Sequence, residues 1–429
     1  MSRTSVFIFI PLLVIVLLIS CGSNHQEHSV LLIILDAVRA DHLSCYDYQR
    51  ETTPVLDSLA EQGTIFTRCQ AQSPWTLPSC ASILTGLTTK SHGTTTSQRD
   101  TYRLDPTINT LTKILSEAGY MTAGIVNNPL LSQTLGFADY MDYYSFYPQG
   151  DGRSEETVNE AIEWLNTIAT QPFFLMIHIM DPHAPHNPPE PYDTEYSQIG
   201  VSGGTVWFRD QDDRSIILNP EDRDHLVNMY DGEIRSVDVQ LGRLFSEIRE
   251  MGLSNELLII VVADHGEEFL DHGTGGHGHT LYQELLHVPL IISGGNFASG
   301  VVVTEPVGQF DILPTVLDYL NLENPGSLDG ISLLDEISDN RIIPSSGLRG
   351  LNLASVLCGF RKIIGDMDTY DYVMHDLIND PHELVPLTPD SDMFSDLEQY
   401  WSTPPLFNPP TANNAEEIDR TLRDLGYIN

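Results

Sequence analysis

The chain has 429 residues, 41% of them hydrophobic, and its 60 acidic side chains outnumber 21 basic ones, giving a formal net charge of -39. The long-range field of that charge repels phosphate backbones, so the composition argues against nucleic-acid binding. Length and hydrophobic content suit one large α/β enzyme with a smaller carboxyl-terminal subdomain.

The amino-terminal segment has the pattern of a secretory signal. Arg3 precedes an apolar run from Val6 to Ile19, and Ser20 and Cys21 follow. The run is shorter than the ~20 residues that a membrane-spanning helix needs. This favours a lipoprotein signal peptide over residues 1–20, acylation of Cys21, for example with palmitate, and a linker over 21–28; an uncleaved anchor is the alternative. We therefore expect a cell-envelope protein, periplasmic or on the outer surface, held to the membrane by its anchor only.

Four cysteines remain after Cys21. They are Cys45, Cys69, Cys80 and Cys358. Four thiols allow three pairings in an oxidising compartment, and the spacing does not choose between them. The chain has no CxxC motif, which excludes zinc-ribbon and thioredoxin-like sites.

Short apolar runs alternate with helical patterns from residue 29 onward. The expected elements are Ser29–Leu35, Thr53–Gln62, Thr107–Ala118, Met121–Val126, Ser154–Ala169, Phe173–Met180, Asp222–Met251, Leu257–Ala263, Val288–Ser293 and Gln309–Leu320. Continuous apolar strands alternating with helices predict an α/β fold, with a mostly parallel central sheet flanked by helices on both faces. Ligand sites in such folds lie beyond the carboxyl ends of the strands.

The pattern changes near Ile343. Shorter runs at Ala354–Leu357, Phe360–Ile364 and Tyr370–Leu377 predict a small antiparallel subdomain. We therefore divide the chain into a catalytic domain over 29–342, an α+β subdomain over 343–387, and a tail over 388–429. The tail is acidic and rich in Pro and Asn, and we expect it to wrap the surface or to be partly mobile.

Two of the predicted strands run directly into polar residues. Asp36 follows the first strand, with Arg39 three residues later, and Asp264 and His265 follow the strand that ends at Ala263. Carboxylate and imidazole at strand ends are typical of metal or catalytic sites, and we include Arg39 among the catalytic candidates. The alternative is that each Asp only caps the turn or helix after it.

A third segment begins at Thr76. Pro78 suits the first turn of a helix and Gly86 its carboxyl cap, so Thr76 lies at a predicted helix amino terminus. Unpaired N–H groups and the helix dipole stabilise an alkoxide or a bound oxyanion there. A threonine hydroxyl becomes a nucleophile only with help from a metal or a base. The alternative is that Thr76 or Ser79 only caps the helix.

Histidines form the fourth feature. His178 and His183 follow the strand that starts at Phe173, and His277 and His279 lie in a glycine-rich run. Neutral imidazole binds metals, whereas imidazolium binds oxyanions or protonates leaving groups. Singly, His178 could be a core residue, and the glycine-rich run could be only a flexible loop, because it lacks a nucleotide-binding fingerprint.

These motifs resemble, in order, those of the sulfatase family within the alkaline phosphatase superfamily, from about Ser29 to Leu387. The similar segments are Leu35–Tyr46, Thr76–Gly86, Ile177–Pro185, Ala263–Glu268 and His375–Leu384. The resemblance implies an alkaline phosphatase-like fold and hydrolysis of sulfuric or phosphoric esters.

Carried over to this chain, the resemblance implies four metal ligands: Asp36, Thr76, Asp264 and His265. It also implies that Thr76 attacks sulfur or phosphorus, and that His183, with His178 nearby, contacts the substrate oxyanion. His277 or His279 would supply a later cationic group that binds substrate, and the sequence does not choose between them.

The chain departs from the family pattern at several positions. Thr76 stands where formylglycine sulfatases carry Cys or Ser, and Cys80 stands where they carry Arg. Ala37 replaces a second metal carboxylate, and His265 stands where many members use an amide. Fewer hard oxygens and an added nitrogen favour zinc or manganese over calcium, as one or two ions.

The leading hypothesis is a metal-dependent hydrolase of sulfate or phosphate (di)esters with a threonine nucleophile. Its expected partner is a sulfated or phosphorylated small molecule or glycan. One alternative is a phospho-group transferase acting on an envelope lipid or glycan, and another is an inactive glycan-binding lipoprotein. The loop from Asn187 to Asn219 is expected to set specificity, and the oligomeric state is open.

Overall fold

The computed structural model describes residues 28–96, 100–147, 153–168, 171–196, 220–254, 256–324, 326–347 and 351–412. The predicted signal peptide, Cys21, most of the linker, the end of the tail from 413 and most of the predicted specificity loop lie outside these residues. Within the described ranges, no helix combines the length and apolarity needed to cross a membrane.

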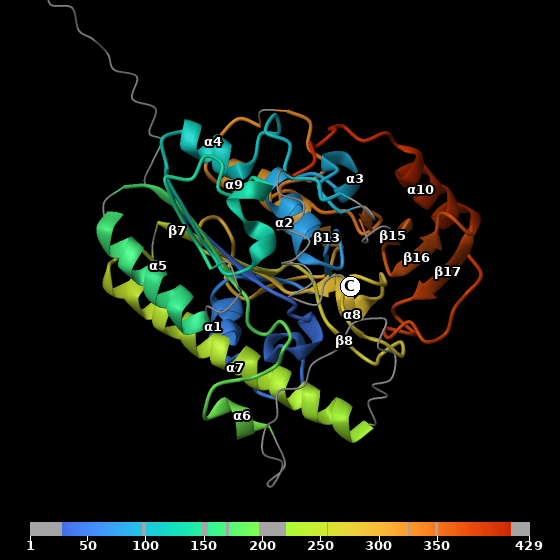
Figure 1. Cartoon of the computed structure of the whole chain (residues 1–429), viewed down its shortest axis with the longest axis horizontal. Helices are drawn as coiled ribbons and strands as arrows, with labels where there is room; N and C mark the ends of the chain where they lie inside the picture. Colours follow the sequence, from blue (N-terminus) through green and yellow to red (C-terminus); the bar gives the residue numbers. More distant parts are fainter. Residues whose placement is uncertain are drawn as a thin grey trace, which may run out of the picture.

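An eight-stranded sheet forms the centre of the molecule, in the order β12-β2-β11-β7-β1-β6-β4-β5 (Figure 1). The strands are β1 (Ser29–Leu35), β2 (Thr64–Phe66), β4 (Met121–Val126), β5 (Tyr143–Phe146), β6 (Phe173–Ile179), β7 (Leu257–Ala263), β11 (Leu290–Ser293) and β12 (Val301–Val303). Only β11 runs antiparallel to its neighbours, which confirms the mostly parallel sheet. Every residue of β1 is buried, as expected for a strand covered on both faces.

Helices cover both faces of this sheet (Figure 1). One face carries α1 (Pro54–Gln62), α5 (Ser154–Ile168) and α7 (Pro220–Glu250), which pack against one another. The other carries α2 (Thr76–Thr85), α4 (Leu111–Glu117) and α9 (Ile312–Tyr319). Shorter helices are α3 (Thr89–His92), α6 (Tyr192–Glu195) and α8 (Gln283–Leu286).

The start of α4 and the run at 288–293 differ from the prediction. Helix α4 begins at Leu111 rather than Thr107, because the Thr110 side chain accepts from the Lys113 N–H and caps it. Pro289 divides the run into β10 (His287–Val288) and β11, since proline has no N–H for a ladder. As a result β10 pairs with β3 (Cys69–Gln70), which also pairs with β13 (Val307–Gly308), while β11 pairs with β7.

The carboxyl-terminal subdomain is a four-stranded antiparallel sheet, as predicted. Its strands, in spatial order, are β14 (Ile342–Ser346), β15 (Leu353–Cys358), β16 (Arg361–Asp366) and β17 (Asp371–Asp376). Helix α10 (Ser391–Ser402) packs on β15 and β16 (Figure 1). The sequence prediction missed this helix within the tail. Asp390 caps it, and Met393 and Leu397, one turn apart, are buried against the sheet.

The four described cysteines are all free thiols. Cys69 and Cys80 are buried, and Cys45 and Cys358 are partly exposed. None of the three pairings that the sequence allowed is formed in the structure.

Candidate active site

The site lies where three neighbouring strands end. Strand β1 lies between β6 and β7, and Leu35 is in register with Ile179 on one side and with Ala263 on the other. Asp36 and Asp264, which each follow the last residue of a strand, therefore lie side by side beyond the carboxyl edge of the sheet. Both are fully buried.

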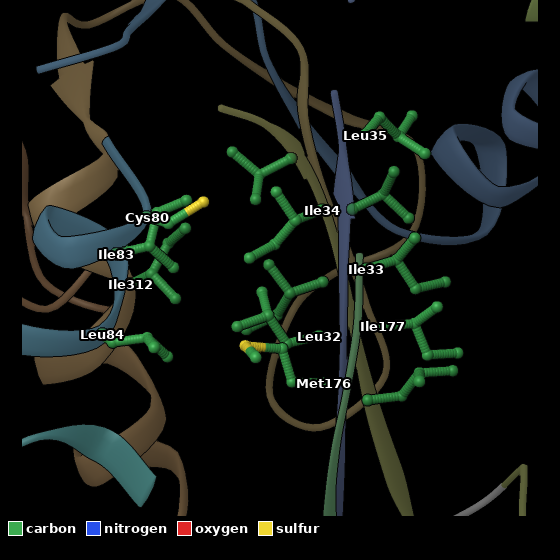
Figure 2. Packing of buried hydrophobic residues seen from close by; sticks show 14 of the residues in the cluster. Leu32, Ile33, Ile34, Leu35, Cys80, Ile83, Leu84, Met176, Ile177 and Ile312 are labelled. Atoms are coloured by element: carbon green, nitrogen blue, oxygen red, sulfur yellow. The ribbon is translucent and has the colours of Figure 1, made fainter. Parts of the chain in front are cut away.

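Strand register also decides which face of the sheet these side chains share. Ile34 pairs with His178, and side chains two residues apart along a strand point to the same face. Asp36 and His178 thus point to the face that carries α2. In Figure 2, Leu32 and Ile34 point toward α2, while Ile33 and Leu35 point away from it.

Helix α2 brings Thr76 to the carboxylates. Thr76 is the first residue of the helix, and Gly86, with φ 67°, ends it in the left-handed conformation that glycine tolerates. The Thr76 Oγ1 atom lies 3.4 Å from His265 Nε2 and 3.3 Å from Asn128 Nδ2. A fully buried hydroxyl at a helix start, beside imidazole and carboxylate, has the surroundings of an activated nucleophile.

Asp264 is held in place through one of its oxygens. Its Oδ1 atom accepts from the backbone N–H of Ala37 at 3.1 Å and of His265 at 2.8 Å. The His265 Nδ1 atom lies 2.8 Å from the Gly266 carbonyl, which can only accept, so Nδ1 carries the proton of the neutral ring. His265 therefore turns Nε2 toward the carboxylates, 3.4 Å from Asp36 Oδ1 and 3.7 Å from Asp264 Oδ2.

The buried charges interact strongly. Burial alone would raise the pKa of Asp36, but His183 and His265 hold it well below its usual range. Burial alone would lower the pKa of His265, but Asp264 and Asp36 raise it to about 9. The carboxylates thus favour a cation between them, and a divalent ion would satisfy the same preference.

The donors present fit a metal ion. Asp36, Asp264 and His265 are buried, and each offers a ligand atom within 4.8 Å of the others. Asp36 Oδ1 and Asp264 Oδ2 accept no hydrogen bond from the described residues. Buried carboxylate oxygens left in this way are costly unless a cation binds them. The structure therefore has a candidate metal-binding group at three of the predicted ligand positions, with the Thr76 hydroxyl beside it.

Of the predicted histidines, His183 and His277 lie at the site and His279 does not contact it. The ring centroid of His277 is 4.3 Å from that of His265 and 4.9 Å from that of His183. His279 instead binds Glu268, with Nε2 2.8 Å from Oε2. The glycine-rich run forms part of the hairpin of β8 (Glu268–Phe269) and β9 (Gly275–Gly276).

His178 lies deeper than the sequence suggested. It is fully buried within β6, and its Nε2 atom is 3.6 Å from Asp36 Oδ2 and 3.7 Å from Asp264 Oδ2. This position places His178 against the two carboxylates.

Arg39 does not contact the cluster. Its guanidinium pairs with Asp41 at 2.8 Å and with Asp271 at 2.9 Å, and donates to the Glu267 carbonyl. The side chain lines a cavity of about 590 Å³ between the catalytic domain and the subdomain, together with Phe360. The expected catalytic arginine is thus paired within an ion-pair network.

Sequence reasoning missed Asn128 and Glu267. Asn128 follows β4, and its Nδ2 atom donates to Asp36 Oδ2 at 2.6 Å. Glu267 is fully buried, and its Oε1 atom lies 3.2 Å from Nδ1 of His277. Burial raises the pKa of Glu267, although nearby histidines oppose the shift. Two successive polar residues after a buried strand, Asn127 and Asn128, were the signal that could have identified this position.

The sequence of this chain is similar to a known protein family. The family model described as Sulfatase matches residues 28–322. An arylsulfatase of Clostridium perfringens is 27% identical over 384 residues, which cover 73% of this chain and 79% of that protein. Arylsulfatase K of Bos taurus is 24% identical over 362 residues, which cover 72% of this chain and 66% of the relative.

Solved structures share the fold. One, in complex with its substrate D-glucosamine-2-N,6-O-disulfate, has a TM-score of 0.73 at 18% identity and covers 93% of this chain and 99% of that one. The phosphonate monoester hydrolase of Agrobacterium radiobacter has a TM-score of 0.70 at 21% identity, with 93% and 96% covered. Since the family model matches well over half of the chain, the chain belongs to the sulfatase family of the alkaline phosphatase superfamily and is by that membership an ester hydrolase.

Proposed function

We propose that this chain hydrolyses sulfate or phosphate (di)esters with Thr76 as its nucleophile and with a divalent ion held by Asp36, Asp264, His265 and Thr76. The observation that carries the proposal is the position of the Thr76 hydroxyl, 3.4 Å from His265 Nε2 and fully buried beside the carboxylates. Zinc or manganese suits the mixed oxygen and nitrogen donors better than calcium.

When bound, the ion would neutralise charge on the ester and make the Thr76 hydroxyl easier to deprotonate. Thr76 Oγ1 attacks sulfur or phosphorus, the bond to the alcohol breaks, and a threonyl ester remains that water hydrolyses by in-line attack. Asn128 orients both Thr76 and Asp36 through its single amide group.

His183 and His277 are assigned to the substrate side. They lie next to each other, and Glu267 orients the His277 ring. In a chain of net charge -39, an anionic substrate needs local positive charge, which imidazolium groups supply. We assign oxyanion binding and protonation of the leaving oxygen to this pair.

The proposed substrate class is a sulfated or phosphorylated small molecule or glycan. Support comes from fold neighbours: one was solved with a glucosamine disulfate and another with a neocarrahexaose. Another fold neighbour is a phosphonate monoester hydrolase, which supports including phosphorus esters in the proposed substrate class.

A lipid anchor at Cys21 is proposed as well. The variant Cys21→Ser should move the protein from the membrane fraction to the soluble envelope fraction.

The test is an assay of aryl sulfate, phosphate diester and phosphonate monoester panels with zinc, manganese or calcium. Thr76→Ala should lower kcat at least about a thousandfold on any active substrate, and Thr76→Ser should retain part of the rate. Thr85→Ala, which changes another buried threonine of α2, is the matched control. Equal rates for wild type and Thr76→Ala on every active substrate would show that Thr76 is not the nucleophile.

Product analysis separates hydrolysis from transfer. If an added alcohol acceptor takes the phospho group in preference to water, the chain acts as a transferase. If no ester is cleaved and a sulfated glycan binds without metal, the chain is a binding protein.

A further inference from the structure

We propose that Cys80, His178 and Asp264 form a second metal site, for a thiophilic divalent ion such as zinc. This site adjoins the first one, because Asp264 belongs to both groups of ligands. Each of the three side chains is buried and offers a ligand atom within 4.8 Å of the others. The proposal concerns metal content, so it can be tested separately from the proposed ester hydrolysis.

The fold explains how these residues meet. Ile34 of β1 is in register with His178 of β6 on one side and Val262 of β7 on the other. Asp264 lies two residues after Val262, so His178 and Asp264 project from the two strands that flank β1 to the face of the sheet that carries α2. Cys80 lies one helical turn after Thr76 on α2 and so shares its side of the helix. Figure 2 shows Cys80 facing β1 across the core, opposite Ile34.

Unsatisfied polar atoms point to a cation at this position. Among the described residues, neither ring nitrogen of His178 has a hydrogen-bond partner, and Asp264 Oδ2 has none. His178 and Asp264 are both fully buried, so bulk solvent does not reach them. Burying polar groups without a hydrogen bond is costly, and metal coordination would remove that cost.

The donor set selects the class of metal. A thiol, an imidazole and a carboxylate match the sulfur, nitrogen and oxygen ligands of zinc, whereas calcium and magnesium take oxygen ligands. Without a metal, Cys80 would be one more small apolar residue of the core, which is the commonest role of a buried cysteine. That role does not explain why neither ring nitrogen of His178 makes a hydrogen bond to the described residues.

Asp264 is suited to bridge two ions. Its Oδ1 atom is fixed by two backbone N–H groups, and its Oδ2 atom lies 3.7 Å from Nε2 of both His265 and His178. One oxygen thus faces the ligands of both sites. His178 is accordingly a metal ligand rather than a substrate contact.

The experiment uses the full chain, stripped of metal with a chelator and reloaded with Co²⁺. Thiolate coordination gives cobalt a near-ultraviolet charge-transfer band, which oxygen and nitrogen ligands do not give. Wild type should bind about two equivalents and show the band. Cys80→Ser should lose the band and about one equivalent, whereas Thr76→Ala, which removes a proposed ligand of the first site alone, should keep the band.

The matched control is Cys69→Ser, since Cys69 is equally buried but lies outside the cluster. It should keep both the band and the metal content. If wild type shows no charge-transfer band, the proposal is wrong. This result needs no variant, so the proposal can be tested even if Cys80→Ser fails to fold. A band that survives Cys80→Ser overturns it too.

The same measurements separate this proposal from the proposed function. If Thr76→Ala loses hydrolysis and keeps the cobalt band, the result supports both the nucleophile and the second metal site. If Thr76→Ala hydrolyses at the wild-type rate and keeps the band, Thr76 is not the nucleophile and the second metal site is still supported.

Discussion

The side-chain amide of Asn128 donates to Asp36 Oδ2 at 2.6 Å, which joins the end of β4 to the end of β1 across the intervening strand β6. The same Nδ2 atom lies 3.3 Å from the Thr76 hydroxyl. One amide group thus sets the distance between the proposed nucleophile and a proposed metal ligand. Groups that orient metal ligands in this way affect affinity and rate without touching the ion.

Asn128→Ala should lower kcat by about 10- to 100-fold and weaken metal binding by a similar factor, since Asp36 loses the donor that orients it. Asn128→Asp keeps the size but places a carboxylate against Asp36, so it should be more damaging than Ala in the absence of metal. Steady-state kinetics and metal titration measure both effects. Wild-type kcat and metal affinity in Asn128→Ala would mean that the contact has no part in the site.

A second prediction concerns the two histidines that the sequence could not separate. His277 packs against His265 and His183, whereas His279 binds Glu268 and Thr274. His277→Ala should therefore lower kcat/KM by about 100-fold, as expected for a lost proton donor or oxyanion contact.

The matched variant His279→Ala removes an imidazole from the same loop and should leave kcat/KM within about threefold of wild type, with any loss appearing as lower stability. Parallel assays of the two variants on one substrate decide the matter. The reverse order of effects would assign the cationic role to His279.

The positions of Asp36, Asp264 and Thr76 could be predicted because each depends on one local rule. An apolar run ending in Asp marks a strand end, and Pro78 with Gly86 brackets α2. The position of Asn128 depends on β4 being next to β6, a strand order that a single chain does not reveal. The same limit applies to Arg39, whose strand-end position was correct but whose guanidinium is bound by Asp271, 232 residues later.

A third prediction concerns acid stability near the nucleophile helix. His92 is fully buried; its Nδ1 accepts from the Thr94 N–H at 2.9 Å, and its Nε2 lies 3.0 Å from the Ser82 hydroxyl of α2. Burial lowers the pKa of His92 to about 3, because the charged ring is disfavoured away from water. The contact at Nδ1 is compatible only with the unprotonated nitrogen of the neutral ring. The native state therefore prefers neutral His92.

The unfolded chain binds this proton below its ordinary pKa of 6.5, whereas the folded chain binds it only near 3. Stability from His92 is thus fully present above pH 6.5 and is lost as pH falls, by about 1.4 kcal/mol per unit. Urea unfolding at pH 7 and pH 5 should show a loss of about 2 kcal/mol that His92→Asn lacks. The exposed residue His382 offers the control His382→Asn, which should keep the wild-type slope. An equal slope in His92→Asn would assign the acid sensitivity elsewhere.

The last prediction concerns the junction between the subdomain and the catalytic domain. Lys362 of β16 pairs with Glu383 at 3.0 Å, and both side chains are almost completely buried. Glu383 also accepts from the Gln283 N–H at the start of α8, so the pair ties the two parts together. Burial lowers the pKa of Lys362 while Glu383 opposes the shift, so the charged state depends on the partner.

Removing one partner leaves a buried charge uncompensated, whereas removing both does not. Glu383→Leu alone should therefore cost about 3–5 kcal/mol of unfolding free energy, and adding Lys362→Met should recover part of that loss. The recovery remains incomplete because the Gln283 N–H still lacks its acceptor. Urea unfolding of both single variants and the double variant gives the coupling energy. A double variant as unstable as the sum of the singles would mean that the pair contributes no interaction of its own, and that the subdomain is held mainly by its apolar contacts.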